Sequence, residues 1–387
     1  MKKSSYKAAM IVAAVLASVM TLGTEHVVVQ AAVPTQIIAS ASQMKRASVR
    51  DLTTDTRVFY RDPAIEVKQV RFENRYGFEV AGHLYLPKGF NIDRQYKAVI
   101  ITGPFGAVKE QASGLYAQEL AKHGFVAVAF DPSMTGESSG IRRNMGSPEI
   151  FTEDYHAAAD FVSNLKFVNP NQIGALGICG LSGMAITAAG SDSRIKAVAT
   201  SAMYDMSESI SDHYNGAYYT PQQREIVLKH LAKMRNEEAK TGQAISGSHE
   251  LALDVAGNVI STKTMFPDKL PADANAVVKD FYGYYVTRAY HPRAINSNTL
   301  AWDAVTPYGF FDFNLMDNIK ELGNKPVLLI TGSNAHSKYF SDAVYQKLST
   351  RNKEEIVVPG ATHVDLYDQL DKIPFDKLAA FFNDNLQ

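Results

Sequence analysis

The 387-residue chain is poor in cysteine and in net charge, and each shortage excludes a class of protein. Its single cysteine, Cys179, cannot form an internal disulfide, so a small disulfide-stapled scaffold is excluded. A formal net charge of −1 gives no electrostatic reason to expect nucleic acid or an acidic membrane surface as a partner. With 46% apolar residues, the chain has enough material for a globular core in one or two domains.

The N-terminus is typical of an exported protein. Three lysines precede an apolar run over residues 8–22, and a small-residue cleavage site follows at residues 29–31. The run is shorter than the roughly 20 residues that span a bilayer, and no later run is longer. A lipid anchor would need a cysteine near this site, which the chain lacks. We therefore predict a cleaved signal peptide at residues 1–31, a secreted or extracytoplasmic location and no stable membrane anchor.

Strand and helix signals alternate along the chain, which is the pattern of an α/β protein. Apolar runs alternate with amphipathic stretches, so we expect a mostly parallel sheet with helices on both faces. The first two strands flank Asn74–Gly77 and predict an antiparallel hairpin. The expected strands are 65–72, 78–86, 97–102, 125–130, 173–178, 195–201, 326–331 and 355–358, and the expected helices are 109–123, 148–165, 184–189, 341–348 and 375–385.

This alternation stops between residues 206 and 324, which hold charged and aromatic stretches but no clear buried strand. Because the pattern resumes at the seventh strand, we predict one discontinuous core, residues 61–205 and 325–387. A helical lid, residues 206–324, is inserted between its sixth and seventh strands. Residues 32–60 have no sustained period and are expected to form an extended lead-in.

The strand at 173–178 ends at Cys179, and a short helical stretch follows. A strand that turns directly into a helix lifts the corner residue to the carboxyl edge of the sheet, beside backbone N–H groups and a helix N-terminus. The arrangement resembles the nucleophile elbow of α/β-hydrolases, with cysteine in place of the usual serine. We predict Cys179 as the nucleophile, with a thiol pKa lowered by these neighbours and by a histidine.

Ser182 is the alternative nucleophile. Each count of the elbow leaves one bulky residue where a small one is usual: Leu181 when counted from Cys179, and Met184 when counted from Ser182. The length of the strand favours Cys179 and makes Ser182 the N-cap of the helix.

A thiol nucleophile also needs a base, and it can use an orienting acid. In this kind of fold the histidine comes last, and His363 directly follows the last predicted strand. For the acid we favour Asp205, directly after the sixth strand, over Asp342, whose place at a helix start also suits capping. A Cys–His dyad is chemically tolerable because a thiol needs less activation than a hydroxyl.

Two further parts of the site follow from the same layout. The oxyanion hole is expected from the backbone N–H groups of Gly180 and of Phe105, which lies in the loop after the third strand. The lid begins directly after Asp205, so it starts at the rim of the site. We expect Tyr284 and Tyr285 to line a pocket there for apolar or aromatic groups.

Several strings within residues 60–387 resemble a bacterial group of α/β-hydrolases related to dienelactone hydrolase. That enzyme has a Cys–His–Asp triad and a G-x-C-x-G elbow, so the resemblance supports Cys179 and His363. Leu181 departs from this elbow, and Ala335 stands where the acid would be, so dienelactones are not the expected substrate. The matching strings are Val108–Gln111, Gly114–Ala117, Gly136–Ser138, Gly177–Gly180, Tyr290–Ala294, Ala335–Ser337, Tyr339–Ser341 and His363–Asp368.

These features predict an exported hydrolase that cleaves an ester, lactone or related acyl bond of a small molecule through a covalent acyl-enzyme, with no cofactor or metal. The alternatives are a peptidase-like hydrolase that uses Ser182, or a non-catalytic binding protein on a hydrolase scaffold.

Overall fold

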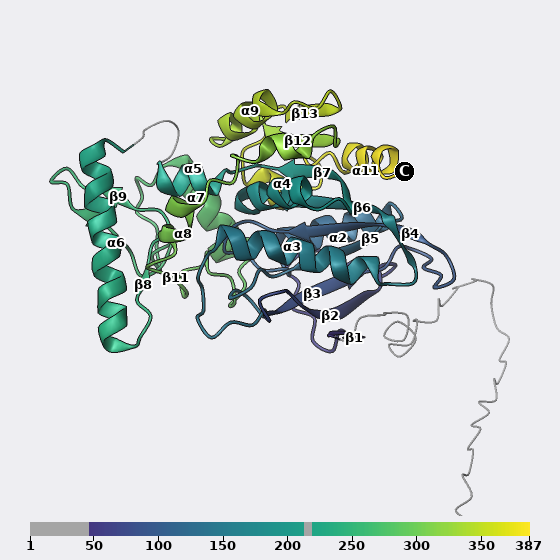
Figure 1. The fold of residues 1–387 in the computed structure, drawn as a ribbon, viewed down its shortest axis with the longest axis horizontal. Coiled ribbons are helices and arrows are strands. Elements are labelled where there is room, and N and C mark those ends of the chain that lie inside the picture. Colours follow the sequence, from purple (N-terminus) through teal and green to yellow (C-terminus); the bar gives the residue numbers. More distant parts are fainter. Residues whose placement is uncertain (1–45, 213–218) are drawn as a thin grey trace, which may run out of the picture. The chain divides into compact units, whose positions relative to one another are not determined.

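The computed structural model describes residues 46–212 and 219–387, so the predicted signal peptide lies outside the described residues. These residues form a nine-stranded sheet with the strand order β1-β2-β3-β5-β4-β6-β7-β12-β13 (Figure 1). The strands are β1 (Ala47–Asp51), β2 (Val67–Glu73), β3 (Glu79–Tyr85), β4 (Tyr96–Thr102), β5 (Val126–Phe130), β6 (Val168–Ile178), β7 (Ile195–Ser201), β12 (Val327–Gly332) and β13 (Lys353–Val358).

The predicted hairpin forms as β2 and β3, and all strands from β5 to β13 in this order pair in parallel. Strand β1 was not expected, because residues 32–60 show no alternating pattern. Only Val49 of β1 is buried, and β1 is formed by antiparallel pairing with β2, opposite Val70. One buried side chain gives no periodic signal, so this strand depends on its neighbour and not on its own sequence.

Helices cover both faces of the sheet, as expected. The apolar side chains of α3, α4 and α9 pack in the core on one face, and those of α2, α10 and α11 pack on the other. Within the described ranges, no helix is both long and apolar enough to cross a membrane. These helices are α2 (Ala112–Lys122), α3 (Pro148–Ser163), α4 (Ser182–Ser191), α9 (Lys338–Lys347), α10 (Asp365–Asp368) and α11 (Phe375–Asn385).

Strands β4 and β6 lie side by side at the centre of the sheet, although β5 separates them in the chain. The chain leaves β4 toward β5 on one side and then returns past β4 to β6 on the other. Parallel strands whose connections diverge in this way leave a crevice at their carboxyl ends, where ligands bind in open α/β sheets. The loop at residues 103–107 follows β4 and Cys179 follows β6, so the order of the strands brings both to this crevice.

The segment between β7 and β12, here called the insertion (residues 206–324), contributes no described strand to the central sheet. Figure 1 draws it in green beside the sheet, with the long helix α6 as its outermost element. Its only described strands are two-residue pairs, which agrees with the absence of a clear strand signal. Its elements are α5 (Met206–Ser211), α6 (Pro221–Thr241), β8 (Ser246–Gly247), β9 (Ala252–Leu253), β10 (Val259–Ile260), α7 (Ala276–Tyr282), η3 (Gly283–Arg288), β11 (Trp302–Asp303), α8 (Pro307–Asp312) and η4 (Ile319–Leu322).

Candidate active site

The chain turns from strand to helix at Cys179, whose φ of 55° lies in the left-handed region. A 3₁₀ turn, Cys179–Leu181, follows β6, and α4 begins at Ser182. A Cβ atom at Gly177 would lie 2.5 Å from Ser182 Cα, so only glycine lets the strand and the helix approach this closely. A non-glycine residue held at positive φ is strained, and such strain clusters at active sites.

Ser182 has a different place from the one expected of a nucleophile or of an N-cap. It is fully buried as the first residue of α4, and its hydroxyl donates a hydrogen bond to the carbonyl oxygen of Gly177 at 3.0 Å. The N-cap position belongs to Leu181, the bulky residue of the elbow, whose side chain packs in the core. The buried hydroxyl of Ser182 therefore stabilises the turn between strand and helix by a hydrogen bond, whereas Cys179 is the residue at the turn itself.

Two backbone N–H groups lie at the thiol, and they belong to the two residues expected to form the oxyanion hole. Hydrogen bonds from the N–H groups of Gly180 and Phe105 act on the sulfur of Cys179. A Cβ atom at Gly180 would lie 2.6 Å from the Cβ of Phe105, so the elbow and the β4–α2 loop are in close contact. Donors fixed in this way can stabilise negative charge on a carbonyl oxygen attacked by the thiol.

The expected low thiol pKa was wrong for the free protein. Burial raises the pKa of Cys179 to about 11, and hydrogen bonds from Tyr367, Gly180 and Phe105 lower it only in part. Removing a thiolate from water disfavours the charged form more than a few neutral donors favour it. The thiol of Cys179 is therefore neutral in the free protein at neutral pH.

We expect Cys179 to react slowly with iodoacetamide in the folded protein, with an apparent pKa near 11. An unperturbed cysteine titrates near about 8.5, so at pH 8 the urea-unfolded protein should be labelled faster than the folded one. Because the chain has one cysteine, the mass of the labelled protein reports this site alone. Faster labelling of the folded protein at pH 8 would instead demonstrate a lowered pKa.

His363 lies in the loop after β13 and reaches the thiol through a tyrosine. Its Nε2 lies 2.8 Å from the hydroxyl of Tyr367, and that hydroxyl in turn hydrogen-bonds the thiol of Cys179. Sequence reasoning missed Tyr367, although it stands four residues after His363, the spacing of one helical turn. Cys179, Tyr367 and His363 thus form a continuous hydrogen-bonded chain.

The second nitrogen of His363 faces a serine and neither of the predicted acids. Nδ1 of His363 lies 2.6 Å from Oγ of Ser337. Asp205 instead caps α5, where its carboxylate accepts hydrogen bonds from the N–H groups of Ser207 and Glu208. The structure therefore does not bring the favoured acid to the histidine, because local capping holds it at the start of its own helix.

Asp342, the other predicted acid, is also engaged elsewhere. It lies on α9, 2.5 Å from the ammonium group of Lys338 one turn earlier. Ser337 directly precedes this helix. It belongs to Ala335–Ser337, one of the strings that resemble the dienelactone hydrolase group, but no role was predicted for it. A neutral hydroxyl in this position can orient the imidazole but cannot balance the charge of an imidazolium.

A second histidine, His336, lies against His363, with 4.8 Å between ring centroids. Its Nε2 lies 2.6 Å from the hydroxyl of Tyr204. Burial lowers the pKa of His336 to about 4, and burial together with the electrostatic effect of His336 holds the pKa of His363 well below its usual value. Both rings are therefore neutral at neutral pH, and His363 is free to accept a proton.

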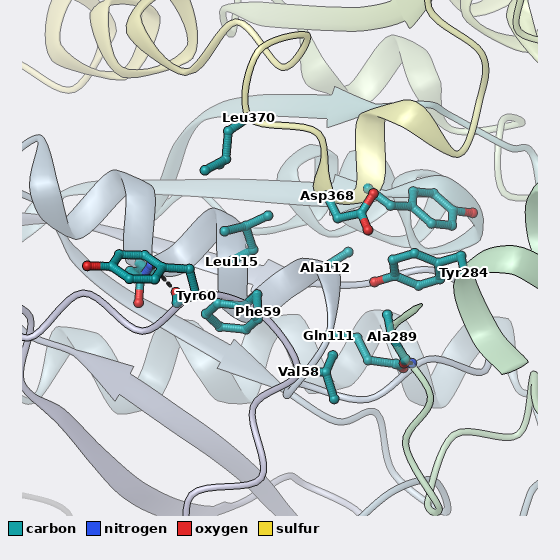
Figure 2. A pocket seen from close by; sticks show the side chains of 12 residues that line it. Val58, Phe59, Tyr60, Gln111, Ala112, Leu115, Tyr284, Ala289, Asp368 and Leu370 are labelled. Carbon is teal, nitrogen blue, oxygen red and sulfur yellow. Dashed lines mark hydrogen bonds between the residues drawn. The ribbon is translucent and has the colours of Figure 1, made fainter. Parts of the chain in front are cut away.

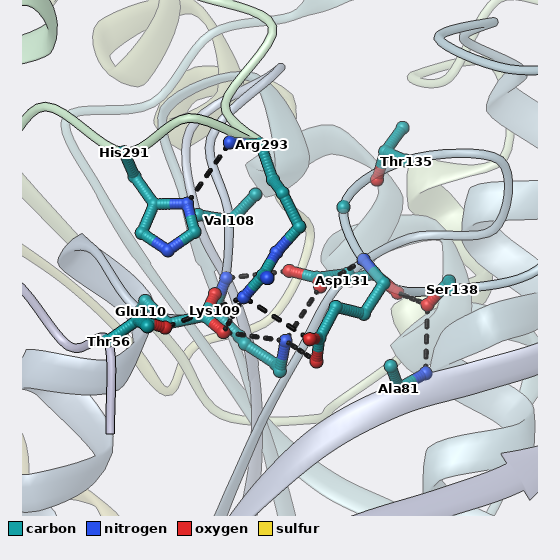
Figure 3. A network of polar contacts seen from close by, with 12 residues as sticks. Thr56, Ala81, Val108, Lys109, Glu110, Asp131, Thr135, Ser138, His291 and Arg293 are labelled. Carbon is teal, nitrogen blue, oxygen red and sulfur yellow. Dashed lines mark hydrogen bonds and ion pairs between the residues drawn. The ribbon is translucent and has the colours of Figure 1, made fainter. Parts of the chain in front are cut away.

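The β4–α2 loop is anchored by a buried ionic network (Figure 3). The ammonium group of Lys109 lies 2.8 Å, 3.0 Å and 2.8 Å from carboxylate oxygens of Glu110, Asp131 and Glu137. Arg293, from the insertion, lies 3.0 Å from Glu110 and 3.2 Å from Glu137. Removing one partner of such a buried network would leave an uncompensated charge, so the network fixes the loop geometry. Three of the strings that resemble the dienelactone hydrolase group contribute residues to this network: Val108–Gln111, Gly136–Ser138 and Tyr290–Ala294.

The two tyrosines predicted to bind substrate, both in η3, pack against each other and against Tyr367, with ring centroids 5.0 Å from it for Tyr284 and 6.2 Å for Tyr285. Tyr284 lines a groove of about 180 Å³ beside α2, together with Phe59 and Leu115 (Figure 2). Burial raises the pKa of Tyr285, and so does its electrostatic interaction with Cys179, which indicates that this phenol lies near the thiol. Tyr285 is therefore the one of the two whose hydroxyl interacts electrostatically with the thiol.

Sequence comparison finds relatives but no matching protein-family model. The chain is 46% identical over 323 residues to the uncharacterised protein PA2218 of Pseudomonas aeruginosa, which covers 83% of this chain and 81% of that protein. It is 32% identical over 307 residues to YcjY of Escherichia coli, over 78% of this chain and 93% of that protein. A shorter match, 32% over 130 residues, joins 34% of this chain to 39% of the thiohydrolase aneE of Aspergillus aculeatus.

Solved structures agree with the fold. The crystal structure of PA2218 matches with a TM-score of 0.78 and 43% identity, over 88% of this chain and 99% of that chain. The α/β hydrolase GrgF from Penicillium matches with a TM-score of 0.65 at 17% identity, over 83% of this chain and 99% of that chain. The mostly parallel sheet with helices on both faces is thus an α/β-hydrolase fold, as the elbow pattern predicted.

Proposed function

Because the chain belongs to the family of α/β-hydrolase-fold proteins that includes PA2218 and YcjY, we propose that it hydrolyses an acyl bond of a small molecule through a covalent intermediate on Cys179. The observation that carries the proposal is a thiol at a strained corner, surrounded by two backbone N–H groups and the hydroxyl of Tyr367. Strain of about 1–3 kcal/mol per residue persists only where its surroundings impose it. A cysteine that served packing alone would not require this corner.

The nucleophile is activated without a preformed thiolate. As the sulfur of Cys179 attacks the carbonyl carbon, its proton passes to the hydroxyl of Tyr367, and the proton of that hydroxyl passes to Nε2 of His363. For Nε2 to accept, Nδ1 carries the ring hydrogen and donates it to Oγ of Ser337. Bond formation to carbon and proton removal from sulfur then occur together, so the high pKa of the resting thiol is no obstacle.

The same residues then support both the formation and the hydrolysis of the acyl-enzyme. The carbonyl π electrons move to oxygen, and the N–H groups of Gly180 and Phe105 bind this oxyanion. When it collapses, the bond to the leaving oxygen or sulfur breaks and His363 returns the proton through Tyr367 to the leaving group. Water next attacks the thioester on Cys179, giving its proton to His363, and collapse releases the acid and restores the thiol.

The bond cleaved is proposed to be an ester, thioester or lactone. A thiol nucleophile exchanges readily with these activated acyl groups, whereas a histidine without a carboxylate partner gives weak support to expelling an amine. The partial similarity to a thiohydrolase also favours thioesters. We also propose that the chain is related to dienelactone hydrolase in particular, and the support for this is the set of matching sequence strings alone.

Trapping the acyl-enzyme tests this function. Acid-quenched reactions with the p-nitrophenyl and N-acetylcysteamine esters of butyric acid should show the protein heavier by one butyryl group, on the peptide that contains Cys179. A binding protein on a hydrolase scaffold would give neither release of p-nitrophenol nor the added mass. An acyl group found on Ser182 would show that the serine is the nucleophile and would favour the peptidase-like alternative.

Export is part of the proposal and has its own measurement. Residues 1–31 are proposed to be removed during secretion, so the mature protein should begin at residue 32. Mass spectrometry of the protein from culture medium or periplasm would measure its N-terminus. A full-length protein retained in the cytoplasm would contradict export and leave the chemistry at Cys179 unaffected.

A further inference from the structure

Five buried polar side-chain atoms of the insertion have no hydrogen-bond partner in the described protein. Two of them, Nε2 of His291 and Nε of Arg293, belong to residues drawn with the ionic network (Figure 3), and three lie outside it. They are the hydroxyl of Tyr285, Oδ1 of Asn296 and Nε1 of Trp302, and each side chain is at least 96% buried. More than nine-tenths of buried polar groups in native proteins are paired, because an unpaired one loses its bonds to water without replacement. The three that lie outside the ionic network indicate a site that a ligand completes.

The side chains of Asn296 and Trp302 pack against the β4–α2 loop, which contains Phe105 of the proposed oxyanion hole. Nδ2 of Asn296 donates to the carbonyl oxygen of Phe105, and the ring of Trp302 stacks on that of Phe105 with centroids 4.2 Å apart. A Cβ atom at Gly106 would lie 2.5 Å from Oδ1 of Asn296 and 2.9 Å from Cζ2 of Trp302. Glycine at this position, with φ of 87°, thus keeps the unpaired oxygen close to the reaction centre.

The ring of Tyr285 lies 6.2 Å from that of Tyr367, centroid to centroid, and Tyr367 contacts His363. Burial and the sulfur of Cys179 raise the pKa of Tyr285, and hydrogen bonds that Asn296 and Tyr367 would give to its ionised form lower it, whereas its neutral hydroxyl has no partner among the described residues. Its hydroxyl can donate one hydrogen bond and accept another, whereas Oδ1 of Asn296 can only accept. The pair therefore suits a ligand group that both donates and accepts, within a few bonds of the carbonyl held at Cys179.

Resting on the function proposed above, we infer that Tyr285 and Asn296 bind a hydroxyl group on the α or β carbon of the acyl chain, so that the preferred substrates are short hydroxyacyl esters or thioesters. The substrate hydroxyl donates to Oδ1 of Asn296 and accepts from the hydroxyl of Tyr285. A carboxylate is a poorer occupant, because the charged side chain that acts on the thiol is the acid Glu250. The cavity of about 180 Å³ bordered by Trp302, His249 and Glu250 leaves room for a polar extension of the substrate.

Matched substrates measure the preference directly. We expect kcat/KM of the wild-type protein to be about 10- to 100-fold higher for 2- or 3-hydroxybutyryl N-acetylcysteamine than for the butyryl thioester, because the butyryl chain leaves two buried groups unpaired. Tyr285→Phe removes one oxygen and should reduce this ratio to about 1–5. Thioester loss is followed by its ultraviolet absorbance, without thiol reagents that would attack Cys179.

Tyr282→Phe is the matched control. This tyrosine lies in the same stretch of the insertion, but its hydroxyl is exposed and donates to the carbonyl oxygen of Asp268 at 2.7 Å, so the substrate ratio should keep its wild-type value. Equal kcat/KM for butyryl and both hydroxybutyryl thioesters, or a preference that survives in Tyr285→Phe, would overturn the inference while the acyl-enzyme still forms. Absence of turnover and of any adduct on Cys179 would instead contradict the proposed function itself.

Discussion

Replacing Cys179 by alanine is expected to lower kcat on p-nitrophenyl butyrate by about 10⁴- to 10⁶-fold, the loss typical of removing a nucleophile. The chain contains no other cysteine, so no second thiol can take over. Alanine at a position with φ of 55° keeps the side-chain volume small, and the strain there is similar for both residues. Steady-state rates, with a thermal melt to establish that the variant is folded, measure the effect.

Ser182→Ala is the control for this experiment. It removes the hydrogen bond to Gly177 from a buried corner, so we expect the free energy of unfolding to fall by about 1 kcal/mol and kcat to stay within a few-fold of wild type. If kcat collapsed in Ser182→Ala and survived in Cys179→Ala, the serine would be the nucleophile.

His363→Ala should produce the second largest loss, about 10²- to 10⁴-fold in kcat, because the chain of proton transfers ends on its Nε2. Tyr367→Phe breaks the same chain one step earlier and should cost a comparable factor. Since the two groups act in series, the double variant should be little worse than the poorer single one. Losses that multiply in the double variant would show that the histidine reaches the substrate without the tyrosine.

Asp205→Asn is the matched control for the histidine. An asparagine also caps a helix, so unfolding free energy should change by less than about 1 kcal/mol and turnover should stay near wild type. A loss of several orders of magnitude in Asp205→Asn would mean that the carboxylate reaches His363 during turnover, as the sequence had suggested. Ser337→Ala should cost less than His363→Ala, because it removes an orienting bond and leaves the base in place.

The order of the elements and the position of the elbow could be read from the sequence. Central strands such as β4 and β5 are buried on both faces, so they appear as continuous apolar runs. The corner at Cys179 is marked by its small neighbours, because the close approach at Gly177 tolerates no side chain. The position of His363 followed from chain order, since the loop after the last strand opens on the same edge of the sheet.

The partners of these residues were decided by the tertiary structure. Asp205 is a carboxylate in a plausible loop, but the first N–H groups of its own helix compete for it and hold it. Ser337 reaches His363 only because the loops after β12 and β13 meet at the end of the sheet, and Tyr367 reaches Cys179 only because the segment after β13 meets the elbow. No local pattern distinguishes a serine that orients a histidine from one that lies on the surface.

The sequence by itself determined the α/β-hydrolase fold, the corner that carries Cys179 and the histidine at the end of the chain, because each follows from local periodicity, residue size or chain order. Only the tertiary structure decided that the thiol is neutral, that a tyrosine stands between it and His363, and that both Tyr284 and Tyr285 pack against this tyrosine. The physical reason is desolvation: the pKa of a buried group depends on every segment that excludes water from it, including the insertion, whose Tyr285 packs in the same core as Cys179 although it lies more than 100 positions away along the chain.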